Sequence, residues 1–102
     1  MPFEFQVIDA STARLGGELT FATAAEAMIA GTRWLSAGSG SATVDCAALQ
    51  RADSAGLAVL LEWLAIATRA QRGVSFVNLP DSLRQLAAIS EVESWLETTS
   101  SR

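Results

Sequence analysis

The 102-residue sequence contains no histidine and no lysine, and Cys46 is its only cysteine. An intramolecular disulfide is therefore excluded, and so is a zinc site built from the usual imidazole and thiolate ligands. The same absences remove the bases that activate a serine in a Ser-His-Asp triad or a Ser-Lys pair. We therefore expect a protein that is not an enzyme and that has no catalytic residues, no bound metal and no cofactor.

Positive charge is also scarce, because the net charge at pH 7 is −4 and the seven basic residues are scattered arginines. Nucleic-acid binding depends on clustered cations, so we expect no nucleic-acid partner. No apolar run reaches the roughly 18 to 20 residues that a membrane-spanning helix needs, and the N-terminus lacks the layout of a signal peptide. These features predict a cytoplasmic protein with no direct membrane insertion.

Hydrophobic residues make up 50% of the chain, and their spacing predicts an α/β protein of one domain, residues 1–102. The predicted strands are 3–9, 13–20, 42–47 and 74–79. The predicted helices are 24–37, 55–71 and 81–90, with a last helical turn at 92–96. Strands joined through helices lie parallel by right-handed crossovers. We therefore expect a mixed β-sheet of about four strands with three to four packed helices.

Three local signals refine these elements. Thr23 and Glu26 have the spacing of a capping box at the start of helix 24–37. The Gly16-Gly17 pair inside a strand indicates a bulge or a close approach of backbones. Gly73 stands where a helix commonly ends. Between the strand 42–47 and the helix 55–71, residues 50–54 are expected to form a polar loop.

That loop presents Ser54 at the start of a helix. The unpaired amides of a helix N-terminus accommodate a phosphate, so Ser54 is a candidate phospho-acceptor. The alternative is that Asp53 or Ser54 only caps the helix. In the first turn of a helix, glycine costs up to about 1 kcal/mol of stability relative to alanine. The presence of Gly56 there is easier to explain if another backbone or side chain comes close to it.

The helix 55–71 is apolar nearly all round, because a stripe of Val59, Trp63 and Ile66 lies beside a stripe of leucines. One face of such a helix packs on the sheet, and the other meets a neighbouring helix or a partner protein. Trp63 is therefore either an anchor for a partner or a core residue covered by the helix that carries Leu83 and Leu86. Both interpretations stay open at this point.

Three segments resemble the STAS domain family, named after sulphate transporters and anti-sigma-factor antagonists. They are residues 17–20 (GELT), 44–46 (VDC) and 53–60 (DSAGLAVL). In that family the Asp-Ser-x-Gly loop carries the serine or threonine that is phosphorylated in the antagonists. Residues 60–64 and 76–83 are most similar to the small cytoplasmic STAS subunit of Mla-type phospholipid ABC transporters.

The resemblance implies a non-enzymatic subunit that binds and stabilises or regulates the ATPase of a bacterial phospholipid ABC transporter, together with its permease. Such a transporter maintains the lipid asymmetry of the outer membrane, and the subunit is held at the inner membrane through its partner. The alternative is an anti-sigma-factor antagonist that a serine kinase phosphorylates at Ser54. The residues expected to bind the partner are Arg51, Asp53, Ser54, Ala55, Gly56, Val59 and Trp63.

Overall fold

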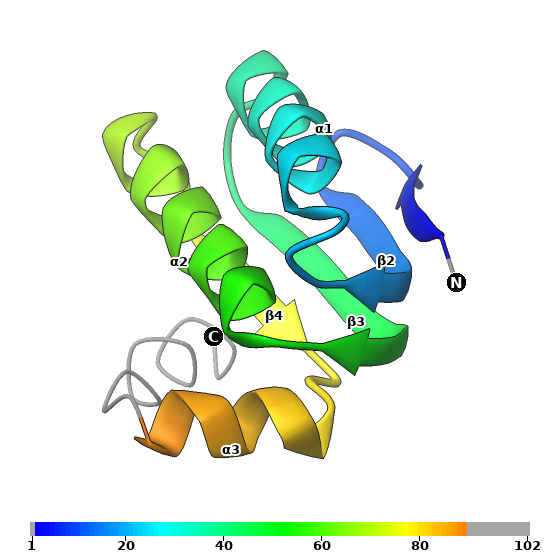
Figure 1. Ribbon diagram of the computed structural model, residues 1–102. Coiled ribbons are helices and arrows are strands. Elements are labelled where there is room, and N and C mark those ends of the chain that lie inside the picture. The colour runs from blue at the N-terminus through cyan, green and yellow to red at the C-terminus, as the bar shows by residue number, and fades with distance from the viewer. Residues whose placement is uncertain (1, 90–102) are drawn as a thin grey trace.

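The computed structural model describes residues 2–89 and contains one mixed sheet with helices packed on it (Figure 1). The elements are β1 (Phe3–Val7), β2 (Thr12–Leu19), α1 (Ala24–Ala37), β3 (Ala42–Ala52), α2 (Ser54–Arg69), β4 (Val74–Val77) and α3 (Asp81–Ile89). The strand order is β1-β2-β3-β4. Strand β1 is antiparallel to β2, whereas β2, β3 and β4 are parallel. The predicted α/β fold with a four-stranded mixed sheet is confirmed, and the turn expected at 92–96 lies outside the described residues.

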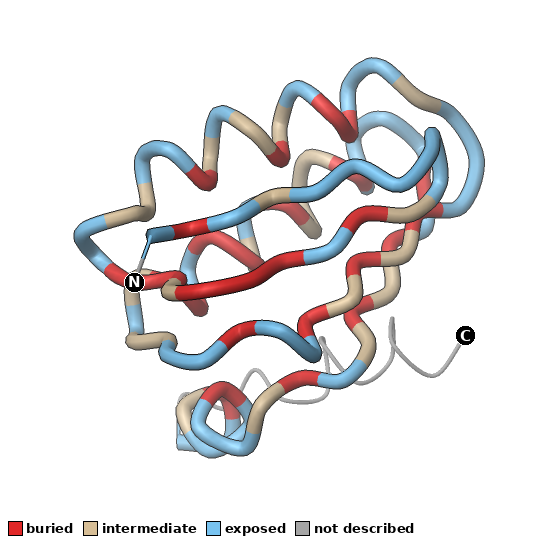
Figure 2. The backbone as a smooth tube through the Cα atoms, turned by 90° about the vertical axis from the view of Figure 1, so that its right-hand side faces the viewer, coloured by how far each residue is buried: buried red, intermediate tan, exposed pale blue. Residues whose placement is uncertain are grey.

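Helices α1 and α2 lie side by side on one face of the sheet, and α3 contacts α2 and β3 (Figure 1). Buried residues alternate with partly buried ones over residues 42–46 of β3 and 74–77 of β4, and the core lies between the sheet and the helices (Figure 2). No described helix covers the opposite face of β1, β2 and β3, which we call the open face; its exposed residues include Glu4, Gln6, Arg14 and Ala48. Cys46 is fully buried, and burial together with the charge of Asp45 raises the pKa of its thiol to about 12.

Several predicted boundaries are wrong. Strands β1 and β4 end at Val7 and Val77, two residues before the predicted ends at 9 and 79. Strand β3 continues to Ala52, because its pairing with β2 runs on through Glu18 opposite Arg51, and only Asp53 separates it from α2. Most of the loop expected at 50–54 is therefore strand. Helix α2 ends at Arg69, and the chain reverses at Gln71, whose φ is 60°, rather than at Gly73.

The capping box expected from Thr23 and Glu26 is also wrong, because the Thr23 side chain caps no amide of α1. Its hydroxyl accepts a hydrogen bond from the Thr20 amide at 3.0 Å and donates one to the Glu18 carbonyl at 3.0 Å. Thr23 therefore fixes the turn between β2 and α1, which forms part of the site described below.

The glycine pair in β2 behaves as predicted. The pairing of β2 with β3 shifts register between Arg14 and Gly16 and again between Gly17 and Glu18. Gly17 has a φ of 74°, and a Cβ atom there would collide with the Pro2 carbonyl oxygen. Both the bulge and the close backbone approach are therefore confirmed.

A buried arginine joins three segments that are distant in the sequence. Arg72 is 4% exposed, and its guanidinium donates hydrogen bonds to the carbonyls of Gly40, Leu35 and Ala10 at 2.8, 3.0 and 3.1 Å. It also lies 5.7 Å from the centre of the Trp34 ring, within the range of a cation–π contact. These contacts connect the turn after β1, the end of α1 and the loop before β3 to the segment between α2 and β4.

Candidate functional site

The Asp53 carboxylate connects the start of α2 to the turn after β2. Its Oδ1 accepts a hydrogen bond from the Gly56 amide at 3.0 Å, so Asp53 is the N-cap of α2. Its Oδ2 accepts one from the amide of Phe21 at 3.1 Å, across 32 residues of sequence. Of the two caps considered from the sequence, Asp53 is the one observed.

The electrostatics of Asp53 follow from these contacts. Burial raises the pKa of its carboxyl, but three backbone amides, led by that of Phe21, and the charge of Arg51 outweigh it and hold the pKa below its ordinary value. Asp53 is therefore an anion at neutral pH. Both carboxylate oxygens are engaged in holding the loop.

Gly56 allows α2 to begin close against the sheet. A Cβ atom at this position would collide with the carbonyl oxygen of Leu19, the last residue of β2. The close approach predicted from the glycine is confirmed. Gly56 is buried by this contact, so it shapes the site and is not itself accessible to a partner.

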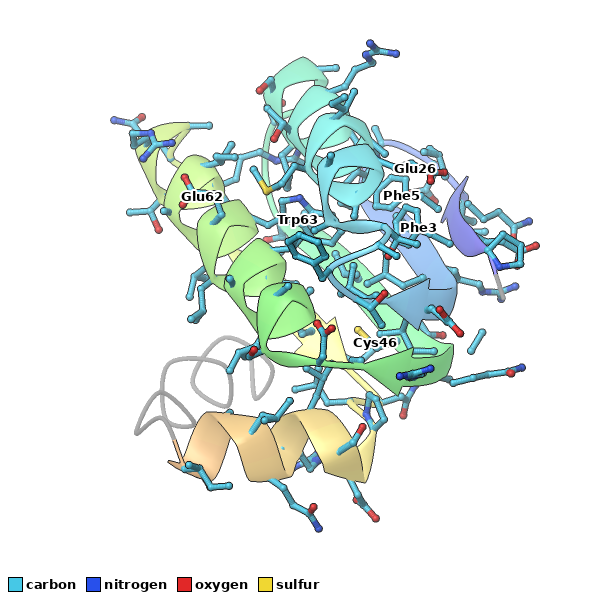
Figure 3. All side chains as sticks on the ribbon, viewed as in Figure 1. Phe3, Phe5, Glu26, Cys46, Glu62 and Trp63 are labelled. Atoms are coloured by element: carbon cyan, nitrogen blue, oxygen red, sulfur yellow. The ribbon has the colours of Figure 1, made fainter. Side chains whose placement is uncertain are left out.

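Trp63 and Val59 are buried as well, at 1% and 3% exposure. The indole of Trp63 points from α2 toward α1 and β1, where it meets Gly31 and packs edge-to-face on Phe5 at 5.7 Å (Figure 3). It is thus a core residue covered by α1 and β1, and not by the helix of Leu83. Gly56, Val59 and Trp63 were expected to bind the partner, but they do not reach the surface of the described chain. Their part in partner binding stays a prediction, and the site is defined without them.

The remaining expected residues do come together at the surface. Arg51 and Ser54 are exposed, and Asp53 and Ala55 are partly buried. Sequence reasoning missed their neighbour Phe21, which is 85% exposed and held beside them by Asp53. Its signal in the sequence is an aromatic residue that precedes the first helix and belongs to no apolar stripe. We call Phe21, Arg51, Asp53, Ser54 and Ala55 the Ser54 surface.

The described residues give little support for a membrane-spanning helix, a metal site or acid–base catalysis. Within 2–89 no helix is long and apolar enough to cross a membrane. No three acidic or cysteine side chains of that range gather into a group that could hold a metal ion. A hollow of about 240 Å³ on the open sheet face contains Asp45, but hydrogen bonds from Asn78 and Ala47 lower the pKa of this carboxyl. A general acid would need a raised pKa.

The sequence that forms this sheet and its helices matches a known family of domains. Residues 6–98 match the family model described as "Mlab, STAS domain". The match covers most of the chain, and the chain belongs to the STAS domain family. STAS domains are in general non-enzymatic modules that interact with partner proteins.

A solved structure supports the fold independently. The described chain is similar to the anti-sigma factor antagonist SpoIIAA in its unphosphorylated form, with a TM-score of 0.66 and 13% sequence identity. The similarity covers 85% of this chain and 82% of that one. At this identity the likeness concerns the fold alone. None of the curated proteins matches the sequence.

Proposed function

We propose that this STAS domain is a non-enzymatic subunit that binds the cytoplasmic ATPase of a bacterial phospholipid ABC transporter through its Ser54 surface. The partner ATPase, with its permease, would hold the domain at the inner membrane, where the complex maintains outer-membrane lipid asymmetry. The description of the matching family model, which names Mlab, supports this choice of partner.

The observation that carries the proposal is the bond between Asp53 and the Phe21 amide. It fixes the backbone of Phe21, whose side chain is exposed, to the residue that precedes the exposed Ser54. Aromatic side chains surrounded by smaller contacts are the usual energetic centres of protein interfaces. Ala55 and the exposed Ala58, one helical turn after Ser54, leave room for a partner to approach α2 closely.

The charges of the Ser54 surface fit a protein partner. Arg51 is exposed and can pair with a carboxylate of the partner. The Asp53 carboxylate already accepts two backbone hydrogen bonds, so it orients the loop rather than contacting the partner. The glycine-containing loops of this chain lack the Gly-Lys-Ser/Thr of a phosphate-binding loop, so the ATPase would supply the nucleotide site.

A second candidate function is an anti-sigma-factor antagonist, with an anti-sigma factor or a serine kinase as partner. The likeness to unphosphorylated SpoIIAA and the exposure of Ser54 at the start of α2 favour it. A phosphate on Ser54 would add about −1.5 to −2 charges beside the ionised Asp53. It would also compete with Asp53 for the first amides of α2, so Ser54 phosphorylation would alter the same surface.

Affinity isolation from the native bacterium tests the proposal. We expect the tagged chain to retain an ABC ATPase with its permease and to carry an unmodified Ser54, as mass spectrometry would show. Phe21→Ala should weaken the purified ATPase complex about 10-fold or more. Ile89→Ala is the matched control, because Ile89 is also exposed (80%) but lies on α3.

The same experiment separates the two functions. Recovery of a serine kinase or an anti-sigma factor, with phosphate on Ser54, would replace the transporter function with the antagonist function. Ser54→Asp should then abolish binding of that partner. Equal weakening by Phe21→Ala and Ile89→Ala would show that the Ser54 surface is not the interface.

A further inference from the structure

Strand β1 (Phe3–Val7) is one of the two edge strands of the described sheet, so one side of its backbone has no strand partner within residues 2–89. An edge of this kind is a template for pairing with another chain unless charges, prolines or bulges protect it. Strand β1 carries a single charged residue, Glu4, and pairs with β2 without a break in register. Pro2 lies just before the strand and not within it.

The hydrogen bonds identify which residues of β1 face the open side. The register places Val7 opposite Ala13, and the Ile8 amide donates to the Thr12 carbonyl at 3.0 Å. Hydrogen-bonded and non-hydrogen-bonded pairs alternate along an antiparallel ladder. Glu4 and Gln6 therefore bond to β2. The amides and carbonyls of the odd-numbered residues 3, 5 and 7 point away from the sheet.

We propose that a second copy of this chain adds to that edge, with the two β1 strands antiparallel about a two-fold axis at Phe5. In this register Phe5 faces Phe5 of the second copy, and Phe3 faces Val7. All three odd-numbered residues then exchange backbone hydrogen bonds with the second copy. The pairing also places a new apolar neighbour beside Val7, which is 53% exposed in the single chain.

The polar side chains select this register. On the open face of the sheet, Glu4 comes opposite Gln6 of the second copy, so a carboxylate meets an amide donor twice. A register centred on Glu4 would place two like charges opposite each other, which is unfavourable. A register centred on Gln6 would leave Phe3 unpaired. A slip by one residue would set apolar side chains against polar ones.

The dimer would be weak, and it would leave the Ser54 surface free. Two five-residue strands form an interface below the roughly 1,200 Å² of stable complexes, so association in the micromolar range or weaker is expected. None of the residues of the Ser54 surface belongs to β1. One dimer would therefore present two Ser54 surfaces.

Sedimentation equilibrium of the full chain, from about 1 to 500 µM, tests the proposal over the range expected for a weak interface. We expect a monomer–dimer equilibrium in the wild type. Gln6→Glu should weaken dimerisation about 2- to 30-fold, because like charges then face each other in both symmetry-related pairs. Gln6→Arg should strengthen it by a similar factor.

An internal control separates dimerisation from folding. Within one chain Gln6 lies opposite Arg14 of β2. Gln6→Glu should therefore raise the melting temperature of the dilute monomer, because it places a negative charge opposite Arg14. Gln6→Arg should lower the melting temperature, because it places two positive charges opposite each other. The effects on folding and on dimerisation thus have opposite signs, and loss of folding cannot imitate the expected pattern.

Disulfide trapping tests the register. In the proposed dimer residues 4 and 6 form a non-hydrogen-bonded pair, with Cα atoms about 4.5 Å apart, which a disulfide can span. Glu4→Cys chains mixed with Gln6→Cys chains should give a covalent mixed dimer, and each variant alone should give far less. The native Cys46 is buried and its raised pKa keeps it unreactive. A monomer at every concentration, or a dimer insensitive to the charge at position 6, would overturn the proposal.

Discussion

The indole ring of Trp63 fills the space beside Gly31 in which a Cβ atom would otherwise lie. This contact brings α1 and α2 together over the sheet, and it explains why a large aromatic residue on α2 is only 1% exposed. The same contact decides between the two roles that the sequence left open for Trp63. The residue belongs to the core that positions the Ser54 surface and not to that surface.

Gly31→Ala should destabilise the fold by about 1–3 kcal/mol, because the new methyl group overpacks the contact with Trp63. This loss should exceed the gain in helix propensity of about 1 kcal/mol that alanine gives over glycine. Urea unfolding measures the difference. Gly73→Ala is the control, because Gly73 has open space around it. Equal stability of Gly31→Ala and the wild type would contradict the close contact.

Trp63→Ala should cost about 3–5 kcal/mol of stability, as for other large aromatic residues removed from a core. Trp63→Phe should cost much less, since it keeps an aromatic ring beside Phe5 and removes a buried Nε1 that has no hydrogen-bond partner. A buried unpaired donor costs about 1–3 kcal/mol. Urea unfolding of both variants measures this order. A Trp63→Ala variant that stays fully stable but loses its partner would restore the interface role.

Asp53 should make the fold sensitive to acid. Its pKa is lowered in the folded chain, so the unfolded chain binds more protons between the two pKa values. The stabilisation is present above the unfolded pKa of about 3.9 and is lost as the pH falls through the folded pKa. Asp53→Asn should flatten this part of the stability–pH curve, measured by urea unfolding from about pH 2 to 7.

Ser54→Ala serves as the control for Asp53→Asn, because it alters the same loop without removing a titrating group. Its curve should run parallel to that of the wild type. Asp9 and Asp45 also have lowered pKa values, from hydrogen bonds to Ser11 and Asn78, so some acid sensitivity should remain after Asp53→Asn. An unchanged curve for Asp53→Asn would contradict the role of its carboxylate.

Arg72→Met should destabilise the fold by about 3 kcal/mol or more. The substitution leaves the carbonyls of Leu35, Gly40 and Ala10 without their donors. The loss at the buried Leu35 carbonyl alone costs about 1–3 kcal/mol, and the two partly buried bonds and the contact with Trp34 add to it. Arg72→Lys should recover only part of the loss, because one ammonium cannot reproduce the planar fork that reaches all three. Arg69→Met is the control, since Arg69 is exposed. Similar unfolding midpoints for the Arg72 and Arg69 variants would show that the hydrogen bonds of Arg72 do not stabilise the fold.

Local patterns were sufficient to predict most of the fold. Helix α1 spans the predicted residues 24–37, because its apolar spacing is a local signal. The end of β3 was missed because Gln50 and Arg51 are exposed and polar, as loop residues usually are. Their pairing with β2 depends on a neighbour that the local sequence does not reveal.

The site was predicted in its loop but not in its neighbours. The Asp-Ser-x-Gly loop made Ser54 a candidate and offered either Asp53 or Ser54 as the helix cap, and the structure shows that Asp53 is the cap. The bond from Phe21 to Asp53 spans 32 residues, so it required the three-dimensional structure. The role of Trp63 could not be predicted from the sequence either. Helix α2 is apolar on two sides, and the local sequence does not show which neighbouring element covers each side.

The hydrogen bonds of Arg72 span 32, 37 and 62 residues of sequence, so they close large loops of the chain. Closing such long loops costs chain entropy before the contacts that they allow can form. We therefore expect these bonds to be weak or absent in the folding transition state. Their main effect would then be on the rate at which the native protein opens, so that Arg72 determines how long a folded molecule persists more than how quickly it forms.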